Sequence, residues 1–207
     1  PVYIVHLSAA GALEAVMTAR DCGQTVFAET CTHYLFLTSD EYDRPGFEGA
    51  KFVMSPPLRD PEDQDALWDG LMTRDLDVIA TDHCPFRIEQ GGFELKSTKL
   101  LGTGAFNKIP NGAPGIEERM TMVFNGAVHD RNMSINRFVE LTSTTPAKLF
   151  GMFPRKGTIA VGSDGDIVLF DPGTEWTIRA AENHGNMDYS LFEDFDVTGK
   201  VQKVFTR

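Results

Sequence analysis

Three apolar segments of the sequence each end in side chains that could bind a metal ion or transfer a proton. His6 follows the first segment, Glu29 and His33 follow the second, and Asp82 and His83 follow the third. Neutral imidazoles together with a carboxylate are ligands of catalytic zinc sites, which leave one coordination position open for water. If the three segments are neighbouring parallel strands, these side chains meet at one edge of the sheet and indicate a catalytic metal site.

Asp82 is the strongest of these candidates. It ends the run Val78–Thr81, whose small and β-branched residues are typical of a strand buried on both faces, and Pro85 prevents the strand from continuing. A carboxylate at the end of a buried strand is costly unless it is paired or ligates a metal. We therefore predict that Asp82 contributes directly to a site.

The other candidates each have a structural alternative. A histidine after a strand, such as His6, can be a hydrogen-bonded structural residue instead of a ligand. Glu29 could bind a metal or accept a hydrogen bond from a loop amide. His33 and His83 rank below these, as residues that pack beside the ligands or support them.

The segments that position these residues alternate between strand and helix. This alternation predicts consecutive βαβ units and hence a parallel sheet. Ser8 and Asp60 are suitable N-caps for the two helices, and Lys51–Met54 is apolar enough for a short strand or an extended loop. The predicted strands are Val2–Val5, Thr25–Ala28 and Val78–Thr81, and the predicted helices are Ala9–Cys22 and a helix that begins at Pro61.

Beyond Asp82 the pattern loosens into a glycine-rich loop, Gly91 to Gly115, of the length that often serves in binding. Helices are predicted at 116–128 and at 135–141, the second capped by Ser134, and strands follow from Lys156 onward. We place one domain boundary here, between residues 1–155 and 156–207. The predicted strands are Thr158–Val161, Ile167–Phe170, Trp176–Ile178 and Val201–Phe205.

Two proline-rich turns could present backbone groups to a ligand. Ser55 begins a Ser-Pro-Pro sequence, and Asn111 lies in an Ile-Pro-Asn-Gly sequence, so the backbone of each segment is restricted. The alternative is that both are ordinary rigid turns.

Composition limits the class of protein. The 207 residues are 42% hydrophobic and 24% charged, with a net charge of −11, which excludes a surface built to bind nucleic acid or an anionic membrane. Three cysteines without paired spacing argue against a disulfide framework, and no 18-residue apolar run or signal sequence is found. We expect a cytoplasmic protein.

Six motifs, taken in order, resemble those of dihydropyrimidinases and D-hydantoinases, which are cyclic amidohydrolases of the amidohydrolase superfamily. The likeness covers nearly the whole chain. The motifs are Tyr-Ile-Val-His-Leu-Ser at 3–8, Glu-Thr-Cys-Thr-His-Tyr-Leu at 29–35, Ser-Pro-Pro-Leu-Arg at 55–59, Asp-His-Cys-Pro at 82–85, Lys-Ile-Pro-Asn-Gly at 108–112 and Lys-Gly-Thr-Ile-Ala-Val-Gly-Ser-Asp at 156–164.

The resemblance implies a (β/α)₈ barrel followed by part of a β-sandwich, with a centre of two zinc ions. In this family the residue matching His6 is a zinc ligand, and the residue matching Asp82 is both a ligand and the general base. Ser55 and Asn111 match residues whose backbone groups hold the cyclic amide or imide substrate. His33 and His83 match no ligand position. Relatives are commonly homotetramers.

The remaining zinc ligands of the family have no counterpart in this sequence. In the family these ligands lie on strands that precede the one ending at His6, and they are a His-x-His pair, a bridging carboxylated lysine and a further histidine. In addition, both ends of the chain lie within apparent strands. We therefore expect the chain to be the C-terminal portion of a larger enzyme, comprising barrel strands six to eight, and to be inactive alone.

The resemblance implies hydrolysis of dihydropyrimidines or 5-substituted hydantoins to N-carbamoyl amino acids. An allantoinase-like or dihydroorotase-like enzyme is an alternative, although the motifs at Ser55 and Asn111 favour the hydantoinase type. A second alternative is a non-catalytic relative that acts as a scaffold. The presence of both His6 and Asp82 counts against a scaffold.

Overall fold

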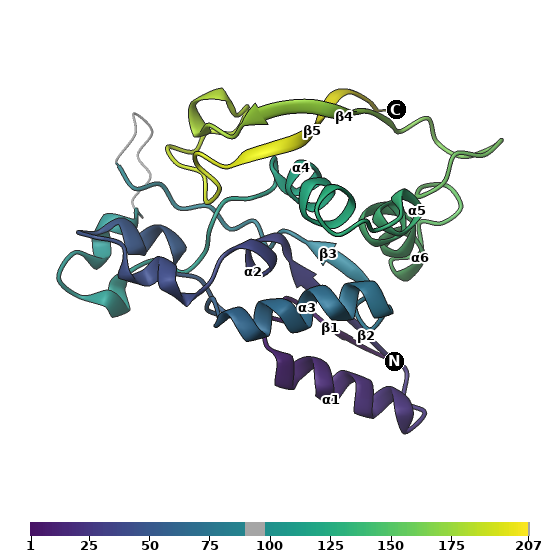
Figure 1. The fold of residues 1–207 in the computed structure, drawn as a ribbon, viewed down its shortest axis with the longest axis horizontal. Coiled ribbons are helices and arrows are strands. Elements are labelled where there is room, and N and C mark those ends of the chain that lie inside the picture. The colour runs from purple at the N-terminus through teal and green to yellow at the C-terminus, as the bar shows by residue number, and fades with distance from the viewer. Residues whose placement is uncertain (90–97, 207) are drawn as a thin grey trace.

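A three-stranded parallel sheet forms the N-terminal part of the fold (Figure 1). The computed structural model describes residues 1–89 and 98–206. The strand order is β1-β2-β3, with Val2 beside Val26 and Glu29 beside Val78, so the predicted parallel arrangement is confirmed. The strands are β1 (Val2–Ile4), β2 (Val26–Cys31) and β3 (Val78–Ala80).

Two helices connect these strands and pack side by side along the sheet (Figure 1). They are α1 (Ala10–Asp21) and α3 (Pro61–Thr73). The prediction that Ser8 caps α1 is wrong, because Ala9 is the N-cap and the buried Ser8 hydroxyl accepts a hydrogen bond from Arg59 Nε at 3.2 Å. Asp63 of α3 instead accepts from the Ala10 amide at 2.7 Å. Asp60 is the N-cap residue of α3 as predicted, although its side chain accepts a hydrogen bond from Ser39 Oγ and makes no capping bond of its own.

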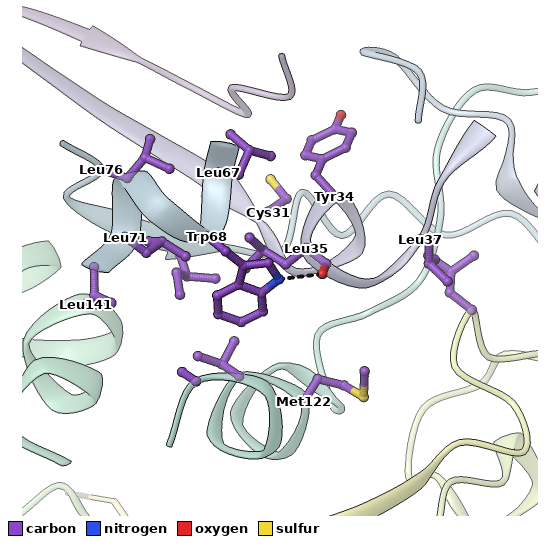
Figure 2. Close-up of a cluster of buried hydrophobic side chains, with 14 of the residues drawn as sticks. Cys31, Tyr34, Leu35, Leu37, Leu67, Trp68, Leu71, Leu76, Met122 and Leu141 are labelled. Carbon is purple, nitrogen blue, oxygen red and sulfur yellow. Dashed lines mark hydrogen bonds between the residues drawn. The ribbon is translucent and has the colours of Figure 1, made fainter. Parts of the chain in front are cut away.

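The main hydrophobic core lies where α3 meets the short helix α2 (Thr32–Phe36) and the chain around residues 122–127. Figure 2 shows the Trp68 indole among these side chains, with its Nε1 donating to the Leu35 carbonyl at 2.9 Å. Phe36 packs edge-on against Trp68, and a Cβ at Gly126 would come within 2.5 Å of the Phe36 ring. The core therefore depends on close backbone approach at Gly126.

The connection from α2 to α3 consists of 3₁₀ turns, and the expected strand or extended loop at Lys51–Met54 is wrong in its first half. The turns are η1 (Ser39–Asp43) and η2 (Glu48–Phe52). In η2 the Val53 amide donates to the Ala50 carbonyl at 3.3 Å, Lys51 pairs with Glu48 one turn earlier, and Phe52 is buried. Of the predicted loop Gly91 to Gly115, residues 90–97 lie outside the described residues, and the rest contains η3 (Lys99–Gly102) and η4 (Phe106–Lys108).

The predicted helices after residue 116 form as short α-helical pieces joined by π-helical turns. The Ser134 cap is confirmed, since its hydroxyl accepts from the Arg137 amide at 3.2 Å. No helix in the described part of the chain is long and apolar enough to cross a bilayer. The pieces are α4 (Arg119–Val123), η5 (Phe124–His129), α5 (Ile135–Val139), η6 (Glu140–Thr144) and α6 (Thr145–Leu149).

The C-terminal strands form a separate antiparallel pair that packs over α4 (Figure 1). They are β4 (Ile167–Thr177) and β5 (Asp196–Phe205), with η7 (Ala180–Glu182) between them. β4 combines two predicted strands, and an irregularity in pairing lies at the predicted Asp-Pro-Gly turn. The predicted strand Thr158–Val161 is wrong, because it pairs with no strand in the described chain and its apolar side chains point to solvent.

Arg137 joins α5 to the end of α3. Its buried guanidinium donates to the Leu71 carbonyl at 3.1 and 3.2 Å and to the Leu76 carbonyl at 2.8 Å. It also pairs with Glu140, whose other partner is the exposed Arg74.

Replacing Arg137 by leucine in the full-length protein is expected to lower the free energy of unfolding by about 3 kcal/mol, because two carbonyls lose a charged donor. Urea unfolding would measure the change. The matched control is Arg74→Leu, which removes the exposed partner of the same Glu140 and should cost under about 1 kcal/mol. Equal losses in the two variants would contradict a special role for Arg137.

Candidate active site

His6 and Asp82 occupy equivalent places at the carboxyl ends of their strands. His6 lies two residues beyond β1 and Asp82 two residues beyond β3, and both have a left-handed backbone, with φ of 40° and 43°. Such φ values are uncommon outside glycine and tend to occur at functional sites. Since β2 lies between β1 and β3, the two strand ends are about 10 Å apart.

The end of β2 lies between these two residues. Burial and the nearby His6 lower the pKa of His33 to about 4, so its imidazole is neutral near pH 7. The ring packs against Tyr34 with centroids 4.2 Å apart. Burial, followed by the charges of Glu29 and Asp82, raises the pKa of the Cys31 thiol. β2 therefore ends in neutral side chains.

Glu29 lies inside β2 and not at its exit, where the sequence placed it. Its carboxylate accepts a hydrogen bond from the Tyr3 hydroxyl at 2.5 Å. Burial, this hydrogen bond and the charge of Glu29 raise the pKa of the Tyr3 hydroxyl. Glu29 therefore has a partner within the sheet.

The two proline-rich turns meet in space although they are far apart in the sequence. Ser55 Oγ donates to Asn111 Oδ1 at 3.1 Å, and the Gly112 amide donates to the Val53 carbonyl at 3.1 Å. Tyr34 Oη donates to the Pro56 carbonyl at 2.7 Å, which ties the first turn to the end of β2. The exposed Ser55 and Asn111 thus form one surface held close to the strand ends.

His83 fixes the second turn to the strand that ends near Asp82. It forms a parallel bridge with Ala113, and its Nδ1 accepts from the amides of Gly115 and Ile116, both at 3.3 Å. These two hydrogen bonds occupy the lone pair of His83 Nδ1. The sequence offered no sign of this loop contact.

The amidohydrolase family matches residues 8–207. The chain belongs to this family. It is 48% identical to the D-hydantoinases of Streptomyces coelicolor and Ralstonia pickettii over all 207 residues, which are 43% and 44% of those proteins. This amidohydrolase chain thus spans less than half the length of these relatives.

Solved structures agree with the sequence comparison. The D-hydantoinase of Bacillus sp. AR9 matches with a TM-score of 0.93 and 47% identity, and the dihydropyrimidinase of Brevibacillus agri NCHU1002 with 0.92 and 49%. Each match covers 99% of this chain and 43% of the other. The L-hydantoinase of Arthrobacter aurescens matches with a TM-score of 0.84 and 30% identity.

The donors in this amidohydrolase chain suit part of a zinc site. An imidazole at His6 and a carboxylate at Asp82 are ligand types that zinc prefers, and both side chains reach solvent. Among residues 1–89 and 98–206, no three His, Cys, Asp or Glu side chains group closely enough to hold a metal ion. A complete zinc site would therefore need donors from beyond these residues.

Sequence reasoning missed one charged residue next to the site. Lys99 has no exposed surface and its Nζ donates to the carbonyls of Val53 and Pro110, at 2.7 and 2.8 Å. Its neighbours in the sequence, Thr98 and Leu100, give no sign of burial. Only the tertiary structure reveals its contacts.

Proposed function

We propose that this chain is the C-terminal part of a zinc-dependent cyclic amidohydrolase. The intact enzyme opens dihydropyrimidines or 5-substituted hydantoins to N-carbamoyl amino acids. The observation that carries this proposal is the identity of 48% to D-hydantoinases over the whole chain. The placement of His6 and Asp82 at the same edge of one parallel sheet supports it.

The fold in the intact enzyme would be a (β/α)₈ barrel with a β-sandwich. We assign residues 1–155 to the barrel, with β1, β2 and β3 as its last three strands, and 156–207 to the sandwich. The parallel strands joined through helices support the first assignment, and the separate antiparallel pair supports the second. A barrel needs all of its strands to close, so three strands would not form a complete site.

His6 and Asp82 would hold two zinc ions together with ligands from the rest of the protein, one of them a bridging carboxylated lysine. Bound zinc lowers the pKa of water to near neutrality and polarises a carbonyl. The Asp82 carboxylate would accept the proton of the attacking water and deliver it to the leaving ring nitrogen. One C–O bond forms, the ring C–N bond breaks, and the proton moves from oxygen to nitrogen.

The turns at Ser55 and Asn111 would bind the cyclic amide or imide. Such a ring has alternating N–H donors and carbonyl acceptors, which backbone groups of the two turns can match. Binding by fixed backbone groups orients the ring carbonyl for attack without ordering flexible side chains. The substrate is thus a small molecule, and we infer no nucleic acid or membrane partner.

The three unpaired cysteines support a reducing, cytoplasmic location. The family resemblance supports a homotetramer.

Metal analysis and a substrate panel would test the proposal. The full-length protein is expected to contain about two zinc ions per chain and to hydrolyse 5-phenylhydantoin or dihydrouracil, with loss of activity after chelation and recovery with zinc. The 207-residue chain with added zinc is the control and should show no turnover. Allantoin or dihydroorotate as the sole substrate would indicate the other amidohydrolase types, and absence of metal would indicate a scaffold.

A further inference from the structure

Lys99 is a charged side chain buried where two turns of the candidate site meet. Its ammonium group donates to the Val53 carbonyl at 2.7 Å and to the Pro110 carbonyl at 2.8 Å, and lies 5.9 Å from the centre of the Phe86 ring. Burial lowers the pKa of Lys99 to about 8, so the group is still mostly protonated at pH 7. A fully buried lysine is rare, because burying its charge is costly without strong hydrogen bonds.

The contacts of Lys99 join three segments of the chain. Its backbone amide donates to the Arg87 carbonyl at 2.9 Å, which anchors it to the segment that follows Asp82. Its Nζ reaches the residue two before Ser55 and the residue just before Asn111. The first segment follows Asp82, to which the proposed mechanism assigns proton transfer. The other two carry Ser55 and Asn111, to which it assigns substrate binding.

One of the two carbonyls depends on Lys99 more than the other. Val53 O also accepts the Gly112 amide at 3.1 Å, so it keeps a partner if Lys99 is removed. Within the described part of the chain, the Pro110 carbonyl accepts its hydrogen bond from Lys99 Nζ. Loss of the ammonium group would therefore free the residue next to Asn111 while the first turn stays partly held.

We propose that Lys99 is a positioning residue for substrate binding, which sets the separation between the Ser55 turn and the Asn111 turn. This inference rests on the proposed function, because that function assigns the cyclic amide to these turns. Lys99 has no exposed surface, so it acts through the backbone carbonyls and not by touching the substrate. In this role Lys99 keeps the two turns close enough for the hydrogen bond of 3.1 Å between Ser55 Oγ and Asn111 Oδ1.

The test is Lys99→Met in the full-length zinc-loaded protein, with 5-phenylhydantoin as substrate. Methionine has a similar length and fills the space but donates no hydrogen bond. We expect KM to rise about tenfold with kcat within about threefold, because lost alignment of binding groups weakens ground state and transition state alike. The matched control is Lys108→Met, which removes an exposed lysine of the same loop and should leave both constants unchanged.

Amide hydrogen exchange provides a second readout that does not depend on turnover. In Lys99→Met we expect faster exchange at residues 111–113 and a smaller increase at 53–55, with exchange in β2 unchanged. If Lys99→Met fails to fold, Lys99→Arg keeps the charge and donors, and its larger head group should displace the same carbonyls and raise KM.

The outcomes separate this inference from the proposed function. An unchanged KM with a lowered unfolding midpoint, or unchanged exchange at 111–113, would overturn the role of Lys99 while leaving the enzyme assignment intact. If the unsubstituted protein hydrolyses no cyclic amide, the proposed function fails, and the substrate role of Lys99 fails with it.

Discussion

Asp82→Asn is expected to lower kcat of the full-length protein by about 10³-fold or more, with zinc content reduced as well. Asparagine has the same shape and tolerates the left-handed backbone found at this position, with φ of 43°. The amide, however, cannot accept the proton that the proposed mechanism transfers, and it is a weaker metal ligand. Steady-state kinetics on 5-phenylhydantoin and metal analysis would measure both effects.

Asp77→Asn is the matched control, since it makes the same chemical change just before the opposite end of β3. Asp77 pairs with Arg20 at 2.6 Å and accepts from the Ala28 amide at 2.8 Å, so its loss should lower stability. Asp77 lies away from the strand end that carries Asp82, and kcat should be retained. Retained turnover in Asp82→Asn, or equal loss in both variants, would refute the role proposed for Asp82.

Local sequence patterns are enough to predict the parallel strands and the polar residues at their carboxyl ends. The runs at Val78–Thr81 and Val2–Val5 are short and apolar, so strand spacing alone places Asp82 and His6 at the same edge. The left-handed backbone of both residues could not be predicted, because histidine and aspartate adopt it more often than most residues but still have a negative φ at the great majority of positions. That conformation depends on the packing around the strand ends.

Long-range contacts account for the failures of prediction. The helix that Ser8 was expected to cap uses Asp63 instead, from a helix 53 residues away in the sequence. His83 and Lys99 likewise act on turns that no local pattern connects to them. The expected strand at Thr158–Val161 failed for the opposite reason: its β-branched pattern is suitable, but pairing requires a neighbour.

Gly112→Ala is expected to have the second large effect, a fall in kcat/KM of about 100-fold in the full-length protein. Gly112 has φ of 139°, and a Cβ there would come within 2.4 Å of the Cys84 carbonyl oxygen. The atom that the Cβ would meet belongs to the backbone of the segment that begins at Asp82 and cannot rotate away as a side chain could. The turn that carries Asn111 would therefore have to move to avoid the clash. A displacement of about 1 Å between binding groups and reacting groups is enough for a loss of this size.

Gly104→Ala separates this steric cause from simple backbone strain. Gly104 also has a positive φ, 79°, but a Cβ there would meet no heavy atom within 4 Å. Alanine at Gly104 should therefore cost about 1–2 kcal/mol of stability and change kcat/KM by less than about threefold. If both variants lose activity equally, the close approach between the Asn111 turn and the segment after Asp82 does not control the site. If only Gly112→Ala loses activity, Gly112 is required because it lets the two segments touch.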